Sequence, residues 1–273
     1  MLLKHTKRAI ESAFGFFGLA LARTTTLQTL RTNELELFRL KKLIAFKSMV
    51  DYSNFSSNEI ERAASEVPDS KSQIYQDLFV LMFLGFKEDG YFVEFGATDG
   101  LRFSNTYLLE KKYGWKGVLV EPAKIWQSSL FENRRCKIDT RCVWAESNKL
   151  LMFNETTIGE LSTLQYLSDR DMHADARKSG NHYYVETVSL NDLLKEHNSP
   201  DFIDYLSIDT EGSEFEILST LNFDKYRFGF ISCEHNFTSV RDQIFELLSA
   251  QGYIRVFPEK SEFDDWYIHS SLV

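Results

Sequence analysis

The sequence has 273 residues, enough for one large domain or for one domain with an extension. Hydrophobic residues make up 43% and charged residues 26%, so the chain can bury a core and global disorder is excluded. The formal net charge is −9. Because nucleic-acid-binding proteins carry a basic surface, we expect neither DNA nor RNA as a partner.

Three cysteines (Cys136, Cys142 and Cys233) are too few and too scattered for a disulfide framework or a zinc knuckle. We therefore expect reduced thiols in a cytoplasmic protein. Residues 1–8 are basic and residues 9–22 largely apolar, which has the rough shape of a signal peptide without a clear cleavage site. The apolar run is shorter than the roughly 20 residues that span a bilayer. We expect a helix that packs on the domain or a partner subunit, or rests on a membrane surface, with a cleaved signal as the alternative.

Residues 1–68 have the pattern of an N-terminal helical extension. Asn33 with Glu36 and Asn58 with Glu61 have the spacing of capping boxes, in which a side chain at the start of a helix and an acid three residues later satisfy each other's backbone groups. The sequence therefore predicts helices that begin at these two positions. It gives no prediction of the oligomeric state.

From residue 69 the pattern changes to alternating strands and helices. Ser70 with Gln73 predicts the start of a helix, and further helices are expected over 105–112, 189–197, 212–221 and 239–250. This alternation predicts an α/β fold with a doubly wound, mostly parallel sheet over 69–273. Residues 155–182 have no clear period, and a segment that long is typical of a lid or insert. The expected strands cover residues 91–96, 117–122, 138–144, 150–154, 183–188, 203–208, 228–233, 253–257 and 266–269.

A strand that runs into a glycine turn occupies residues 93–100. Gly96 and Gly100 lack a Cβ, so the backbone there can turn tightly and approach a ligand. The spacing differs from G-x-G-x-x-G, and no pyrophosphate cradle is indicated. Glu94 and Asp99 could instead offset the cationic groups of S-adenosylmethionine, although such a turn can also be an ordinary loop.

Glu121 ends the next predicted strand, about 25 residues after Gly96. An acid at this place in a doubly wound sheet accepts hydrogen bonds from ribose hydroxyls. A salt bridge at the strand end is the structural alternative.

Two further strand ends carry polar side chains. Asp209 and Glu211 follow the strand over 203–208, where they could act as base, metal ligand or orienting group, or merely cap the next helix. Glu234 and His235 follow the strand over 228–233, and a histidine can exchange a proton near neutral pH. Because the carboxyl ends of parallel strands meet at one edge, these side chains can converge on the same crevice.

At these residues the chain resembles the FkbM-type methyltransferases, class I S-adenosylmethionine enzymes that act mostly on hydroxyls of sugars and natural products. The block over residues 208–214 is the most specific, and the matching stretches together span roughly residues 70–257. Thr98 stands where the family often has Asn, and Tyr75 where it often has Gly. The stretches that carry the resemblance are residues 72–77, 92–100, 104–110, 114–122, 188–194 and 205–214.

The resemblance implies a class I methyltransferase fold, Rossmann-like, with a seven-stranded sheet. It implies that S-adenosylmethionine is held by residues on the first two strand ends, and that a hydroxyl of a small molecule or glycan is the acceptor. It also implies catalytic roles at the later strand ends, and some related sugar O-methyltransferases hold a divalent metal at equivalent positions. The implied cofactor-binding residues are Glu94, Gly96, Asp99, Gly100, Asn105 and Glu121; the catalytic ones are Asp209, Glu211 and His235; the metal ligands are Asp209, Glu234 and His235.

Three alternatives stay open on the sequence alone. The chain could bind S-adenosylmethionine without catalysis, although the acids at both later strand ends count against this. It could methylate a protein or a lipid. A nicotinamide-dependent oxidoreductase is disfavoured because the G-x-G-x-x-G turn is missing.

Overall fold

The computed structural model describes residues 28–50 and 53–273, and the chain divides into two compact units, Met1–Val50 and Asp51–Val273. In the first unit, residues 28–49 form one helix. Asn33 therefore lies inside this helix and does not begin it, because the residues before it are also helical. The predictions for residues 1–22 lie outside the described residues. No helix in the described part of the chain is both long and apolar enough to cross a bilayer.

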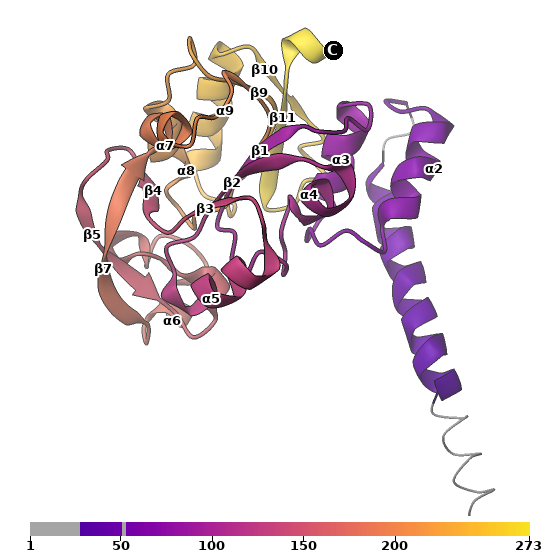
Figure 1. Cartoon of the computed structure of the whole chain (residues 1–273), viewed down its shortest axis with the longest axis horizontal. Helices are drawn as coiled ribbons and strands as arrows, with labels where there is room; N and C mark the ends of the chain where they lie inside the picture. Colours follow the sequence, from indigo (N-terminus) through magenta and orange to yellow (C-terminus); the bar gives the residue numbers. More distant parts are fainter. Residues whose placement is uncertain (1–27, 51–52) are drawn as a thin grey trace, which may run out of the picture. The chain divides into compact units, whose positions relative to one another are not determined.

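The second unit is built on a seven-stranded sheet with the order β10-β11-β9-β8-β1-β2-β3 (Figure 1). Six strands are parallel to one another, and β11 runs antiparallel to both of its neighbours. The predicted doubly wound, mostly parallel sheet is confirmed. Its strands are β1 (Tyr91–Phe95), β2 (Lys116–Val120), β3 (Lys137–Asp139), β8 (Phe202–Ile208), β9 (Arg227–Glu234), β10 (Tyr253–Val256) and β11 (Asp264–His269).

Helices cover both faces of this sheet. Figure 1 shows α3 (Gln76–Phe83) and α4 (Tyr107–Tyr113) on one side and α8 (Glu214–Ser219) and α9 (Val240–Ala250) on the other. The central strands are buried on both faces, which explains their nearly continuous apolar sequences. The same unit also contains α5 (Lys124–Asn133) and α7 (Leu190–Glu196).

Two further predicted helix starts, both in the second unit, are also wrong. Helix α2 (Ser57–Glu66) begins at a capping box made by Ser56 and Glu59, so Asn58 lies in its first turn. Helix α3 begins after Tyr75, the last residue of the preceding loop, which has a left-handed conformation with a φ of 63°. Ser70 lies earlier in that loop, and its hydroxyl donates a hydrogen bond to the Asp77 carboxylate. In both cases a side chain that could cap a helix lies a few residues from the true start. The spacing of the residues alone does not distinguish this position from the true start.

A second, four-stranded sheet was not predicted. It has the order β4-β7-β5-β6 and joins β4 (Cys142–Trp144), β5 (Leu150–Glu155), β6 (Thr163–Leu164) and β7 (Asn181–Ser189). The single strand expected over 138–144 is thus two strands, β3 and β4, that belong to different sheets. The insert predicted between β5 and β7 contains β6, two short 3-10 helices, η1 (Gly159–Leu161) and η2 (Gln165–Leu167), and the single turn α6 (Ala174–Arg177). A third 3-10 helix, η3 (Ser270–Leu272), follows β11.

The strand order reverses between β1 and β8. From β1 the chain proceeds outward through β2 to β3, and from β8 it proceeds the other way to β9. In such sheets the crevice for a ligand opens outside the carboxyl ends of the strands at this reversal. The predicted site residues follow these strands.

Candidate active site

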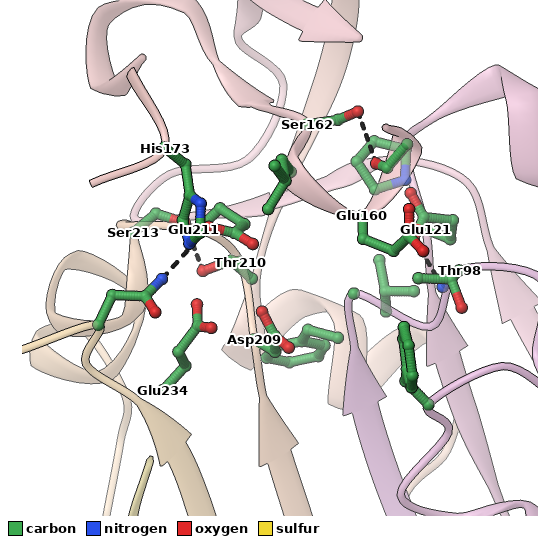
Figure 2. Close-up of a pocket in the computed structure, with 18 of the residues that line it drawn as sticks. Thr98, Glu121, Glu160, Ser162, His173, Asp209, Thr210, Glu211, Ser213 and Glu234 are labelled. Atoms are coloured by element: carbon green, nitrogen blue, oxygen red, sulfur yellow. Dashed lines mark hydrogen bonds between the residues drawn. The ribbon is translucent and has the colours of Figure 1, made fainter. Parts of the chain in front are cut away.

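A cavity of about 330 Å³ lies at the carboxyl ends of β1, β2, β8 and β9, and part of the insert lines it (Figure 2). This volume lies within the range of small-molecule sites. Figure 2 shows Glu121 and Thr98 on one side of the cavity and Asp209, Glu211 and Glu234 on the other. The structure therefore brings the ends of β2 and β8 to the same cavity.

Gly96 joins the tips of β1 and β8. Its φ is 71°, and a Cβ placed on it would lie 2.0 Å from the backbone oxygen of Asp209. Only glycine permits both this conformation and this approach. Gly100 has a different role, because a Cβ there would lie 2.5 Å from Arg134 Cγ and 2.7 Å from Leu130 Cδ1. Gly100 is needed for packing against α5 and does not line the cavity.

Glu94 fixes the loop that carries Asn105. Its carboxylate accepts hydrogen bonds from the backbone N–H of Asn105 (2.7 Å) and the hydroxyl of Ser104 (3.1 Å), and also from the hydroxyl of Thr106. Burial raises the pKa of Glu94, although Arg134, 3.8 Å away, opposes the shift. Both Glu94 and Asn105 line the cavity, and their roles in cofactor binding stay a prediction.

Asn105 presents a free acceptor to the cavity. Its side-chain amide donates to Ser207 Oγ at 2.9 Å, whereas its Oδ1 is buried and has no hydrogen-bond partner among the described residues. A buried carbonyl oxygen without a donor is costly. The oxygen is therefore suited to accept a hydrogen bond from a ligand.

Asp99 is not brought to the cavity. Its carboxylate accepts from the backbone N–H groups of Leu101 (2.9 Å) and Arg102 (2.7 Å), which stabilises the turn after β1. The side chain is occupied by its own backbone, as aspartate often is in turns. Arg102 in the same turn pairs at 2.8 Å with Glu160 of the insert, a residue that lines the cavity.

Glu121 follows β2 and lines the cavity. Its two carboxylate oxygens accept from the backbone N–H groups of Thr98 and Ala123, each at 2.8 Å. Burial raises the pKa of Glu121 to about 8. The two backbone bonds fix the carboxyl between the turns that follow β1 and β2, where the ribose of a nucleotide is expected.

Asp209, Glu211 and Glu234 form a compact acidic cluster. One carboxylate oxygen of each lies within 4.8 Å of the others. Burial raises the pKa of Asp209 to about 7, with Glu214 and Glu94 adding to the shift. Burial and the neighbouring Asp209 raise the pKa of both Glu211 and Glu234 well above the ordinary glutamate value. Burial is the main cause of all three shifts and the charges of neighbouring carboxyls add to it, whereas a hydrogen bond with Glu234 opposes the shift of Asp209.

His235 does not face this cluster. Its Nε2 lies 3.0 Å from the backbone oxygen of Asp264, and its Nδ1 accepts from the backbone N–H of Phe237 at 3.0 Å. Both ring nitrogens are thus held in the loop after β9, and the side chain does not line the cavity. Glu211 occupies the place beside Asp209 and Glu234 that the sequence assigned to His235.

The insert supplies residues that the sequence did not single out. Arg177, fully buried, pairs with Glu211 at 2.7 Å and with Asp171 at 2.8 Å. His173 lines the cavity, and Figure 2 shows it beside Glu211 and Ser213. The segment has no hydrophobic period, so only its charged residues could have signalled these contacts.

The chemistry of the lining favours a cationic ligand. Apolar side chains, Val120, Val143 and Phe153 among them, line part of the cavity and offer it a surface on which a flat ring can pack. Among the described residues that line the cavity there is no lysine or arginine, which a pyrophosphate would call for. The acids that line it are Glu94, Glu121, Glu160, Asp209, Glu211 and Glu234.

The chain matches the methyltransferase FkbM domain over residues 94–255, more than half of its length. It belongs to this family. A comparison with curated proteins gives no match. Membership implies S-adenosylmethionine as the methyl donor, and the residues fit this cofactor: Asn105 offers an unused acceptor to its ammonium group, and the acids suit its positive charges.

Three solved structures that are named as methyltransferases resemble the chain at low similarity. Methyltransferase FkbM from Methylobacillus flagellatus is 10% identical over 84% of this chain and 59% of that one, with a TM-score of 0.41. Precorrin-6y C5,15-methyltransferase from Geobacter metallireducens is 10% identical over 70% and 85%, with a TM-score of 0.40. Human methyltransferase 10 domain containing protein is 12% identical over 73% and 84%, with a TM-score of 0.35. Similarity at this level identifies no substrate.

Proposed function

We propose that this FkbM-family methyltransferase transfers a methyl group from S-adenosylmethionine to a hydroxyl oxygen of a sugar or glycan. The observation that carries the proposal is the convergence of Asp209 and Glu234, from the ends of two neighbouring strands, on the side of the cavity away from Glu121 (Figure 2). A hydroxyl must lose its proton when its oxygen is methylated, and carboxylates are suited to accept it.

The surroundings of this acidic cluster also suit a sugar. Polar side chains from the insert and from the loops after β8 and β9 (His173, Ser213 and Asn236) can bind several hydroxyls. Phe237 and Phe263 line the same cavity and offer apolar faces. A pocket with a few polar groups and an aromatic wall matches a ring that has polar edges and apolar faces.

Each residue has a task in this reaction. When bound, S-adenosylmethionine supplies a methyl carbon made electrophilic by its sulfonium. Glu121 accepts hydrogen bonds from the ribose, and Asn105 holds the amino-acid end. Asp209 lies beside the acceptor and takes the proton of the hydroxyl, while Arg177 holds Glu211 in place. Alignment of the hydroxyl by these groups supplies much of the rate, because the reaction needs its atoms in line.

The proposal is tested with the full chain, methyl-labelled S-adenosylmethionine and a panel of oligosaccharides, peptides and lipids. The expected product is a methyl ether on a sugar oxygen, located by mass spectrometry. Label on a peptide or a lipid would refute the sugar acceptor. Cofactor binding without transfer to any class would indicate a binding protein.

Asp209→Asn tests the base. We expect turnover to fall about 100-fold or more, because general-base catalysis contributes about 10²–10⁴-fold. The affinity for S-adenosylhomocysteine should change little. Asp99→Asn makes the same chemical change in a turn outside the cavity and should keep turnover near that of the wild type. Equal activity of the two variants would exclude Asp209 as the base.

A further inference from the structure

We infer that Asp209, Glu211 and Glu234 form a binding site for one divalent cation, of the hard class that includes Mg²⁺ and Mn²⁺. One oxygen of each carboxyl lies within 4.8 Å of the others, so small rotations of the side chains would bring all three around a single ion. The three residues come from the ends of β8 and β9, so the parallel strands themselves bring the carboxyls together.

The unsatisfied charge in the cluster is the first reason. Arg177, at 2.7 Å from Glu211, is the one cationic side chain within ion-pair distance of these three carboxyls in residues 28–50 and 53–273. Because Arg177 also pairs with Asp171, four carboxylates against one guanidinium leave three negative charges in excess when all are ionised. Buried charges without partners are strongly disfavoured, so the cluster requires protons or a cation.

An unpaired oxygen is the second reason. Glu234 is only 7% exposed, and its Oε2 has no hydrogen-bond partner among the described residues. Glu211 binds Arg177 and Asn236 through Oε2, which leaves its Oε1 for another partner. Shared protons can bridge two carboxyls at a time, whereas a cation satisfies all three at once.

The donor set selects the kind of ion. All three ligands are carboxylate oxygens, and His235, which would favour zinc or another transition metal, faces away. Oxygen ligands of this kind suit Mg²⁺ or Mn²⁺, with water or an acceptor oxygen completing the coordination. A cation here would polarise an acceptor oxygen. That use rests on the proposed function, but binding of the ion does not.

The test measures ion binding without an acceptor. The full chain is freed of metal with a chelator and titrated with MnCl₂ by calorimetry and electron paramagnetic resonance, with and without S-adenosylhomocysteine. We expect one Mn²⁺ per chain, displaced by Mg²⁺, and a rise in melting temperature. Glu234→Gln should weaken binding at least tenfold, yet fold well, because it removes an unpaired buried charge. Glu216→Gln, a charge change outside the cluster, should bind Mn²⁺ like the wild type.

Two results would overturn the inference. The first is that the wild type takes up no Mn²⁺ under either condition, which would mean that protons neutralise the cluster. The second is that Glu234→Gln and Glu216→Gln bind Mn²⁺ equally, which would place the ion elsewhere. Neither result bears on whether a hydroxyl is methylated, so failure here and failure of the proposed function are distinguishable.

Discussion

Gly96 is the residue at which the tips of β1 and β8 touch. Gly96→Ala should cost about 1–2 kcal/mol for the left-handed conformation, and about 1–3 kcal/mol more for overlap with the Asp209 carbonyl. Gly85→Ala is a matched control, because Gly85 has a similar φ of 62° and nothing within 4 Å of its Cβ position. Urea denaturation of both variants separates the two costs. An equal loss of unfolding free energy in Gly96→Ala and Gly85→Ala would mean that the contact with Asp209 is unimportant.

Glu121 should make the protein less stable as the pH rises. Its pKa in the folded chain is about 8, raised from 4.5. Because the pKa is raised on folding, the contribution of Glu121 to stability is fully present below its pKa in the unfolded chain. This contribution is lost as the pH rises through its pKa in the folded chain. Glu121→Gln removes this pH-dependent loss of stability because glutamine does not ionise. Its side-chain NH₂ group faces a backbone N–H, which lowers the stability of the variant at every pH. From pH 5 to pH 9 we therefore expect the free energy of unfolding to shift in favour of the variant, by a few kcal/mol at most.

Unfolding at several pH values checks this expectation, and Glu121→Gln should also weaken S-adenosylhomocysteine binding. Exposed Glu132 gives the control, since Glu132→Gln should follow the wild type at every pH. A constant difference between Glu121→Gln and the wild type from pH 5 to pH 9 would contradict the assignment.

Arg177 connects two elements, the insert and the loop after β8. Arg177→Met should destabilise the protein by about 3–5 kcal/mol, because it leaves Asp171 and Glu211 buried without a cation. Arg170→Met is the control: Arg170 is 55% exposed and 4.0 Å from Glu216, and such pairs contribute about 0–1 kcal/mol. Chemical denaturation gives both values. Losses of similar size would show that the insert does not depend on Arg177.

At the scale of elements, the sequence predicted the strands that have a clear local pattern and the residues that directly follow them. Gly96, Glu121 and Asp209 could be found because each follows a buried strand, and parallel strands deliver their ends to one edge. His235 was misassigned because the direction of the chain after β9 depends on Asn236 and Phe237, whose φ values are 43° and 57°. Asparagine often adopts this conformation but phenylalanine rarely does, so the residue types alone do not indicate this turn.

The insert could not be predicted for a different reason. Its contacts with the strand ends are made by Arg177 and His173, which are held by tertiary pairing and not by any period. The four-stranded sheet was missed because β6 has only two residues and β4 looked continuous with β3. Pairing between strands far apart in sequence decides such cases.

At the scale of the whole molecule, every cavity-lining residue among those described lies between Gln73 and Phe263. These residues belong to the second compact unit, Asp51–Val273. We therefore expect a chain of residues 51–273 to bind S-adenosylhomocysteine within about threefold of the full chain, which is a difference of less than about 1 kcal/mol. Calorimetric titration of both proteins measures this. A greater loss would give the first 50 residues a part in the site.

The pair between Arg102 and Glu160 joins the turn after β1 to the insert, and the side chain of Arg102 is 55% exposed. Water and salt reach such a pair and weaken it, whereas the buried pair of Arg177 with Glu211 is shielded. The two attachments of the insert thus differ in strength. We therefore expect the part of the insert around Glu160 to separate from the turn after β1 more easily than the part around Arg177 separates from Glu211.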